Sequence, residues 1–236
     1  MTTFYINSRN KSSGTHSDFT YRLELDPNTD ATRAVVLEAN IPKSYYLIPD
    51  GYNTLTLTEG IGEGETDYTI TIPAGNYNRK QLKTKLQSLL DAAGDYTYTI
   101  SYQTTYDDGL YSFSSTGDNS SITTSYLNIA EALGIEKSTD YSMPFTSPNV
   151  IKLIKEDCLY LHSDLVQSRN NNVLQTIYTA SSNDFGNILF KQKNVKYNSK
   201  QILTNKSNAY RFYLTDENDQ AIDLNGLNIN LVLYVF

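Results

Sequence analysis

The residue types that most often catalyse reactions or bind metals are scarce in this sequence. It contains two histidines, His16 and His162, and a single cysteine, Cys158. Cys158 and His162 would share one face of a strand, but at roughly 3.3 Å per residue they would lie about 13 Å apart, too far to bind one zinc ion. We therefore expect both residues to be structural, and His16, which falls in a polar segment, to be solvated.

Two acidic segments could hold a cation, but each has a simpler structural interpretation. Residues 107–109, Asp-Asp-Gly, lie between two strand patterns and are typical of a hairpin turn. They lack the regularly spaced acids and the distal glutamate of an EF-hand calcium loop. Residues 59–65 carry three glutamates among glycines, which predicts a flexible, solvated loop that binds a cation weakly at most.

The same glycine-rich segment does not fit a nucleotide-binding loop. No Lys-Ser or Lys-Thr pair follows its glycines, and Glu63 and Glu65 would repel phosphate. A glycosidase would need two carboxylates about 5 to 9.5 Å apart across a cleft. Glu24 and Glu38 both fall at outward-facing positions of predicted strands. The sequence therefore predicts no enzyme: no catalytic residue, no bound cofactor and no metal ligand.

Strand patterns dominate the elements that would position these residues. Apolar and polar residues alternate in four segments, 19–25, 55–57, 68–72 and 96–102. Further strands are expected at 33–39, 110–114, 153–161, 174–179, 188–191, 210–214 and 228–236. Turn signals such as Asp26-Pro27-Asn28 separate them at the spacing of a sandwich or barrel. Two short helices are expected, at 78–92 with an apolar leucine stripe and at 127–133 before Gly134.

The length of 236 residues is compatible with a single all-β domain. We therefore expect one domain over residues 1–236, with residues 1–16 a candidate extended N-terminal arm. Residues 117–148 are rich in Ser, Thr and Asn and are interpreted as an insertion between strands. The polar segment 167–172 is expected to form an exposed loop. The arm and the insertion are the segments most suited to contact neighbouring subunits.

Charge and composition restrict the partners. The net charge of −7 repels nucleic acids and anionic membranes, so we do not expect nucleic acid to be the main partner. No membrane segment is predicted. One cysteine cannot form an intrachain disulfide, and the first residues show no secretory signal. We expect synthesis in a reducing cell interior. Tyrosine is abundant, with 20 residues and no tryptophan, which suits strands and subunit interfaces.

The lysines at 191, 193, 196 and 200 form the one basic cluster in the sequence. Two functions are conceivable, contact with DNA or contact with an acidic neighbouring subunit. A third interpretation is structural, because lysines on an exposed strand edge prevent sheets from joining edge to edge.

Several segments, taken in their order along the chain, resemble one family of viral proteins. They are Phe4-Tyr-Ile-Asn-Ser8 with Ser17-Asp-Phe-Thr-Tyr21, residues 34–46 ending in Ile-Pro-Lys-Ser-Tyr-Tyr, residues 68–77 leading into the leucine-rich helix, residues 128–135, and residues 212–217, 223–227 and 231–234. The order resembles that in the penton or minor capsid proteins of virophages, polinton-like viruses and related double-stranded DNA viruses.

This resemblance implies a single jelly-roll sandwich, in which two antiparallel four-stranded sheets pack face to face, with short helices in insertions. It also implies a structural virion protein that forms homopentamers at the five-fold vertices of an icosahedral capsid and contacts the major capsid proteins. The alternative is a jelly-roll binding module that recognises a carbohydrate or a host receptor, with tyrosine rings as sugar platforms. Both functions can coexist at a vertex.

Overall fold

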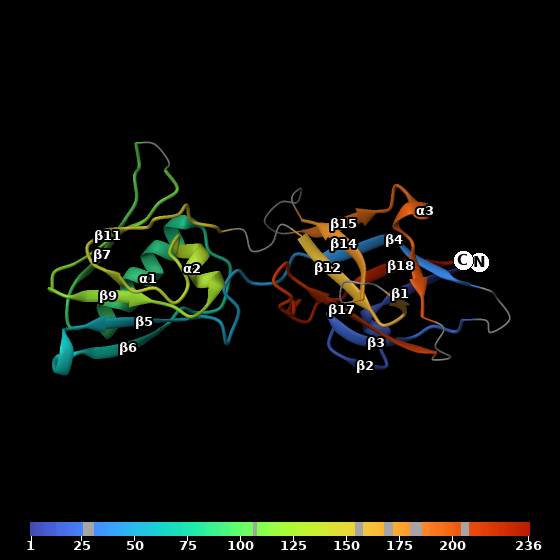
Figure 1. Cartoon of the computed structure of the whole chain (residues 1–236), viewed down its shortest axis with the longest axis horizontal. Coiled ribbons are helices and arrows are strands. Elements are labelled where there is room, and N and C mark those ends of the chain that lie inside the picture. The colour runs from blue at the N-terminus through green and yellow to red at the C-terminus, as the bar shows by residue number, and fades with distance from the viewer. Residues whose placement is uncertain (26–30, 106–107, 154–157, 168–171, 180–185, 204–207) are drawn as a thin grey trace. The chain divides into compact units, whose positions relative to one another are not determined.

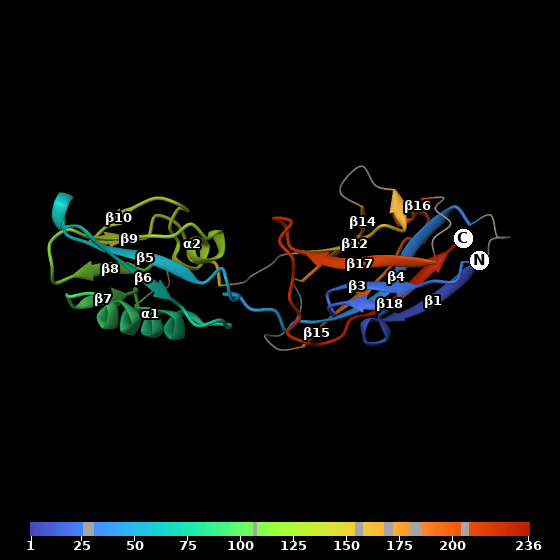
Figure 2. The same cartoon turned by 90° about the horizontal axis from the view of Figure 1, so that it is seen from below.

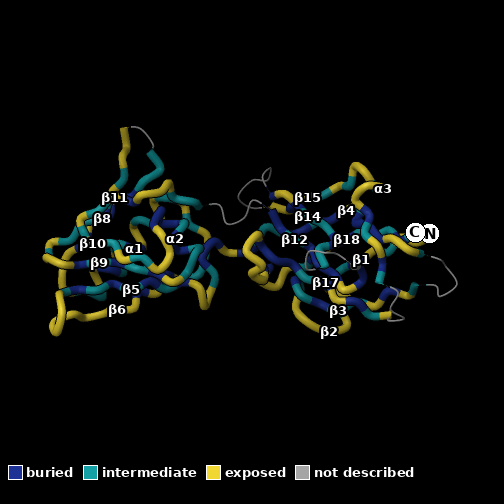
Figure 3. Tube along the Cα trace, viewed as in Figure 1, coloured by how far each residue is buried: buried dark blue, intermediate teal, exposed yellow. Residues whose placement is uncertain are grey.

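The chain forms two compact units in a computed structural model (Figure 1), which describes residues 1–25, 31–105, 108–153, 158–167, 172–179, 186–203 and 208–236. Unit 1 comprises Met1–Tyr45 and Glu156–Phe236, and unit 2 comprises Tyr46–Lys155. Each unit has its own cluster of buried apolar side chains. The Cα trace in Figure 3 is dark blue where residues are buried, and both units contain such stretches. The described residues contain no helix long and apolar enough to cross a membrane.

Unit 1 contains two antiparallel sheets (Figure 2). The six-stranded sheet has the order β1 (Thr2–Asn7), β18 (Asn230–Val235), β4 (Arg33–Pro42), β16 (Lys200–Ile202) and β13 (Val166–Gln167), and β15 (Asn187–Lys191) pairs with β4 beside β16. The five-stranded sheet has the order β14 (Val173–Tyr178), β12 (Cys158–Ser163), β17 (Ala209–Thr215), β3 (Asp18–Arg22) and β2 (Ser13–Gly14).

The strand pairing in unit 1 is that of a jelly roll. The eight main strands in chain order are β1, β3, β4, β12, β14, β15, β17 and β18. The first pairs with the eighth, the second with the seventh, the third with the sixth and the fourth with the fifth. This nested pairing is a long hairpin rolled into two sheets. The prediction of an all-β jelly roll is therefore confirmed, and the short strands β2, β13 and β16 extend its two sheets.

The core of unit 1 lies between the two sheets, because alternate residues of each strand point inward. Ile6 and Leu233 of the six-stranded sheet belong to the same buried cluster as Phe19, Leu161 and Phe212 of the five-stranded sheet. These five side chains are almost fully buried. The intervening residues of each strand point away from this core.

Unit 2 has two small sheets and two helices. One sheet has the order β10 (Tyr141–Ser142), β9 (Ser120–Thr123), β5 (Thr54–Glu59) and β6 (Thr66–Thr71), and the other has the order β11 (Phe145–Thr146), β8 (Ser112–Ser115) and β7 (Tyr98–Ser101). The helices are α1 (Arg79–Ala93) and α2 (Leu127–Leu133). Short helical turns complete the chain: η1 (Ser8–Asn10) and α3 (Val195–Asn198) in unit 1, and η2 (Gly62–Gly64) in unit 2.

Helix α1 follows directly from its sequence. Asn78 accepts a hydrogen bond from the backbone N–H of Gln81, and the Gln81 side chain accepts one from the backbone of Asn78, which together form a capping box. Leu82, Leu86 and Leu90 form the buried stripe. Both predicted helices are confirmed, α1 to within one residue at each end.

The division into two units differs from the single domain expected over residues 1–236. All of unit 2 lies between β4 and β12 in the chain, and residues 117–148 form only part of it, because their strands β9 and β10 extend the sheet of β5 and β6. Residues 1–16, expected as an arm, contribute β1, which pairs with β18 along its whole length. Turn residues 26–28, Asp107 and residues 168–171 of the predicted polar loop lie outside the described residues.

Candidate assembly surfaces

The histidines and the cysteine do not converge on a reactive site. Cys158, Tyr160 and His162 occupy alternate positions of β12, so they share one strand face as the sequence predicts. His162 is buried, and its Nε2 lies 2.9 Å from the Thr215 hydroxyl. His16 lies in unit 1 near Lys11, whose amine is 3.5 Å from its Nδ1. Across the described ranges, no three His, Cys, Asp or Glu side chains gather so as to hold a metal ion.

The outer face of the five-stranded sheet carries a continuous row of ring and guanidinium contacts. The ring of Tyr213 stacks on that of His162 at 4.5 Å between centroids, and Tyr160 meets His162 edge to face at 6.4 Å. The Arg211 guanidinium lies 4.4 Å from the Tyr213 ring centroid. Arg211 also donates two hydrogen bonds of 2.7 Å to the Asp18 carboxylate, which raise its pKa. The row spans β12, β17 and β3.

The outer face of the six-stranded sheet carries a row of a different kind, which we call the outer row. Tyr5, Val232, Glu38 and Lys191 lie opposite one another across β1, β18, β4 and β15. Lys191 and Glu38 form an exposed ion pair of 3.4 Å. Tyr5 is 77% exposed, and Leu189, two residues before Lys191 on the same face, is 73% exposed. Large apolar side chains left in solvent on a flat sheet face mark a candidate contact surface.

A row of asparagines borders the outer row. Asn7 lies opposite Asn230, and Asn230 lies opposite Asn40. The Asn7 side-chain amide donates a 2.7 Å hydrogen bond to Oδ1 of Asn230, while the buried Oδ1 of Asn40 accepts no hydrogen bond from the described residues. A contacting molecule could satisfy that acceptor.

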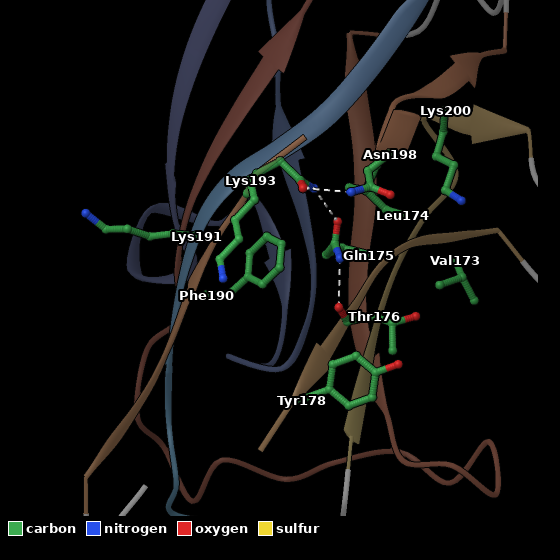
Figure 4. A pocket seen from close by; sticks show the side chains of 11 residues that line it. Val173, Leu174, Gln175, Thr176, Tyr178, Phe190, Lys191, Lys193, Asn198 and Lys200 are labelled. Atoms are coloured by element: carbon green, nitrogen blue, oxygen red, sulfur yellow. Dashed lines mark hydrogen bonds between the residues drawn. The ribbon is translucent and has the colours of Figure 1, made fainter. Parts of the chain in front are cut away.

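A hollow of about 460 Å³ lies where the two sheets of unit 1 end side by side. Its lining comes from β14, from the end of β15 and from the segment that leads through α3 to β16 (Figure 4). We call it the edge pocket. Three of its lining residues are lysines, Lys191, Lys193 and Lys200, and none is acidic. The basic cluster predicted from the sequence thus borders a concave surface, whose other wall, β14, the sequence did not indicate.

A chain of amide side chains crosses the edge pocket (Figure 4). Asn198 donates a 2.8 Å hydrogen bond to Oε1 of Gln192, and Gln192 donates one of 3.2 Å to Oε1 of Gln175. Gln175 in turn donates a 2.7 Å hydrogen bond to the carbonyl of Thr176 on β14. The chain therefore joins α3 to β14 and fixes the polar groups of the pocket.

In unit 2 the structure corrects the prediction for Glu59. The sequence places it in a solvated loop, but it ends β5 and is only 5% exposed. The Tyr98 hydroxyl donates to its Oε1, and the backbone N–H of Asp95 donates to the same oxygen at 3.0 Å. Burial raises the pKa of Tyr98, and the hydrogen bond to Glu59 raises it further. Glu63 and Glu65 are exposed, as predicted.

Arg79 ties the start of α1 to the segment before β8. Its guanidinium lies 4.3 Å from the ring centroid of Tyr102 and 3.3 Å from Oδ1 of Asp108, and it donates a 2.5 Å hydrogen bond to the carbonyl of Leu110. Asp108 Oδ1 also accepts a 3.0 Å hydrogen bond from the backbone of Leu110, the main cause of its lowered pKa. Asp108 therefore holds the backbone of the segment that connects β7 and β8, and the hairpin turn at residues 107–109 stays a prediction because Asp107 lies outside the described residues.

Comparisons with known proteins find similarity among solved structures. No protein-family model and no curated protein sequence matches the chain. A crystal structure of the mavirus penton protein is similar to it over 100% of both chains, with a TM-score of 0.51 and 13% sequence identity. The chain shares its fold with the mavirus penton protein. Because the similarity extends over the whole length, it includes both units.

Proposed function

We propose that this chain is a structural protein of a virus capsid, and specifically a penton protein that forms homopentamers at the five-fold vertices and contacts the major capsid proteins around them. The observation that carries the proposal is the full-length similarity of its fold to that of the mavirus penton protein. The order of sequence segments described above supports the same family. The protein would then be located in the virion.

The surfaces of unit 1 are compatible with this role. A ring of identical subunits needs a heterologous contact, in which two different patches of neighbouring copies meet. The two outer faces of the jelly roll differ in the required way. One presents exposed Tyr5 and Leu189 beside asparagines, and the other presents the ring contacts of Arg211 and Tyr213. The polar and titratable groups described in unit 2 hold segments of that unit to one another, which suits a structural protein better than an enzyme.

The proposal is tested by the absolute mass of the purified full-length chain. Size-exclusion chromatography with light scattering, over a concentration series at moderate salt, should give five times 26.6 kDa. Negative-stain images of the same fraction should show rings with five-fold symmetry. A dimer or tetramer at every concentration would contradict the proposed vertex position. A strict monomer would require co-expression with the cognate major capsid protein, and failure to incorporate into its particles would then refute the proposal.

A second candidate function is recognition of a carbohydrate or host receptor. Tyr178 at the end of β14 is 75% exposed and lies on the same sheet face as Tyr160, so one face offers a tyrosine platform. A glycan array probed with the full-length chain tests this function. Specific binding that is lost in Tyr178→Ala would support this function. An array without signal would contradict it, and the capsid role would remain as the single proposed function.

A further inference from the structure

We infer that the edge pocket binds an extended acidic segment of another protein, which adds to the jelly roll as a further strand. This binding site goes beyond the proposed vertex role, and it does not depend on the number of subunits.

Two strand edges beside the pocket are free among the described residues. β14 is the last strand of the five-stranded sheet and pairs with β12 on one side only. β15 likewise pairs with β4 on one side only. A free edge presents backbone N–H and C=O groups in the spacing of a strand, and an extended peptide binds to such groups by strand addition. The edge pocket lies between these two edges.

The charge of the lining selects acidic segments. Lys191 points away from the pocket in Figure 4 and pairs with Glu38. Lys193 and Lys200 have no carboxylate within ion-pair distance anywhere in the described part of the chain. Two uncompensated ammonium groups at one concave site attract a carboxylate-bearing segment, although the molecule as a whole carries −7.

The remaining lining fits the alternate side chains of a strand. The ring of Phe190 and the side chain of Tyr178 offer apolar contact, while the amides of Gln175, Gln192 and Asn198 offer polar contact. Nucleic acid is a poorer occupant, because it has no peptide backbone to form the hydrogen bonds of strand addition. An extended peptide satisfies both the free edges and the lysines.

A second copy of this chain is disfavoured as the occupant of the pocket. Pairing the β14 edges of two copies would bring Lys193 and Lys200 close to the same lysines of the other copy. Like charges facing one another across an interface oppose its formation. Lysines on exposed edges protect sheets against this kind of self-pairing. The pocket is therefore suited to a different, acidic chain, such as a neighbouring protein of a shell.

The test uses the full-length protein and three synthetic ten-residue peptides, each acetylated and labelled with rhodamine. The first alternates glutamate and valine, the second alternates lysine and valine, and the third alternates glutamate and proline. Fluorescence anisotropy measures their binding. The Glu-Val peptide should bind at least tenfold more tightly than either of the others, because proline removes every second backbone N–H and holds φ near −65°, away from the ordinary strand conformation. Equal binding of the Glu-Pro peptide would overturn strand addition, and equal binding of the Lys-Val peptide would overturn charge selection.

Matched variants locate the site. The double substitution Lys193→Glu with Lys200→Glu should weaken binding of the Glu-Val peptide at least tenfold, while Lys80→Glu with Lys85→Glu, the same charge change on α1, should leave it unchanged. Equal effects of the two pairs would overturn the assignment to the edge pocket. Competition by an equal concentration of a thymidine decamer would overturn the acidic peptide as the occupant. Lys193→Gln with Lys200→Gln provides the same test with a smaller change in charge. None of these results depends on whether the chain forms pentamers.

Discussion

Phe19 and Phe212 lie directly opposite each other on β3 and β17, and their rings stack at 5.8 Å between centroids in the core of the jelly roll. Because both side chains are almost fully buried, truncation of either leaves a cavity between the two sheets. Phe212→Ala should lower the free energy of unfolding of unit 1 by about 3 to 5 kcal/mol. Urea unfolding followed by circular dichroism measures this change. The neighbouring Arg211→Ala, on the solvent side, is the control and should cost about 1 kcal/mol or less.

Arg79→Met should release the start of α1 from Tyr102 and Leu110. The substitution keeps much of the aliphatic length but removes the contact with the Tyr102 ring, the ion pair with Asp108 and the hydrogen bond to Leu110. We expect a loss of about 1 to 2 kcal/mol in the stability of unit 2, measured by urea unfolding. Arg79→Lys keeps the charge but not the planar fork, and should recover only part of the loss. Full recovery with lysine would show that charge alone matters.

The buried pair of Tyr98 and Glu59 should make unit 2 sensitive to alkaline pH. The pKa of Tyr98 in the folded state lies above the ordinary tyrosine value, because burial and the hydrogen bond to Glu59 favour the protonated hydroxyl. The unfolded chain therefore loses this proton at lower pH than the folded chain does. The stabilisation is complete below about pH 10 and is lost as the pH rises from there towards the folded pKa.

Tyr98→Phe tests this dependence. Urea unfolding of the native chain from pH 8 to 11 should show stability falling above about pH 10, and the variant should show a flatter curve. Tyr96→Phe, an exposed tyrosine two residues earlier, serves as the control and should keep the native slope. Identical curves for Tyr98→Phe and the native chain would remove Tyr98 as the cause.

The outer row should contribute to contacts between subunits. The double substitution Tyr5→Asn with Leu189→Asn replaces two exposed apolar side chains without touching the core, so the fold should persist while assembly weakens. Light scattering should show a shift from the oligomer towards the monomer at the same concentration. Tyr197→Asn on α3 removes another exposed tyrosine and should leave the mass unchanged. If both variants assemble as the native chain does, the interface lies on another face.

Local patterns were sufficient to predict several elements. The leucine stripe and the capping residues of α1 are encoded within fifteen residues, and β3 follows from the alternation around Phe19. The two-unit division was not predictable in this way, because β5 and β3 show the same kind of alternation and only distant contacts assign them to different cores. Glu59 was missed because its glycine-rich neighbours indicate a loop, whereas its burial depends on Tyr98, about forty residues later.

The candidate surfaces could be predicted from the sequence only in part. The lysines of the edge pocket were evident as a cluster, but its other wall, β14, becomes apparent only when two segments meet in space. The outer row combines residues from both ends of the chain and from two central strands, so no single segment reveals it.

The pairing of β1 with β18 also determines when unit 1 can finish folding during synthesis. Asn7 and Asn230 are 223 positions apart, so β1 must wait until β18 has left the ribosome, whereas unit 2 is contiguous and can fold earlier. Tyr5 and Val232 can come together only after β18 has been synthesised. A product that ends before β18 would therefore lack the outer row, and a partner that recognises this surface would bind only copies that contain both strands.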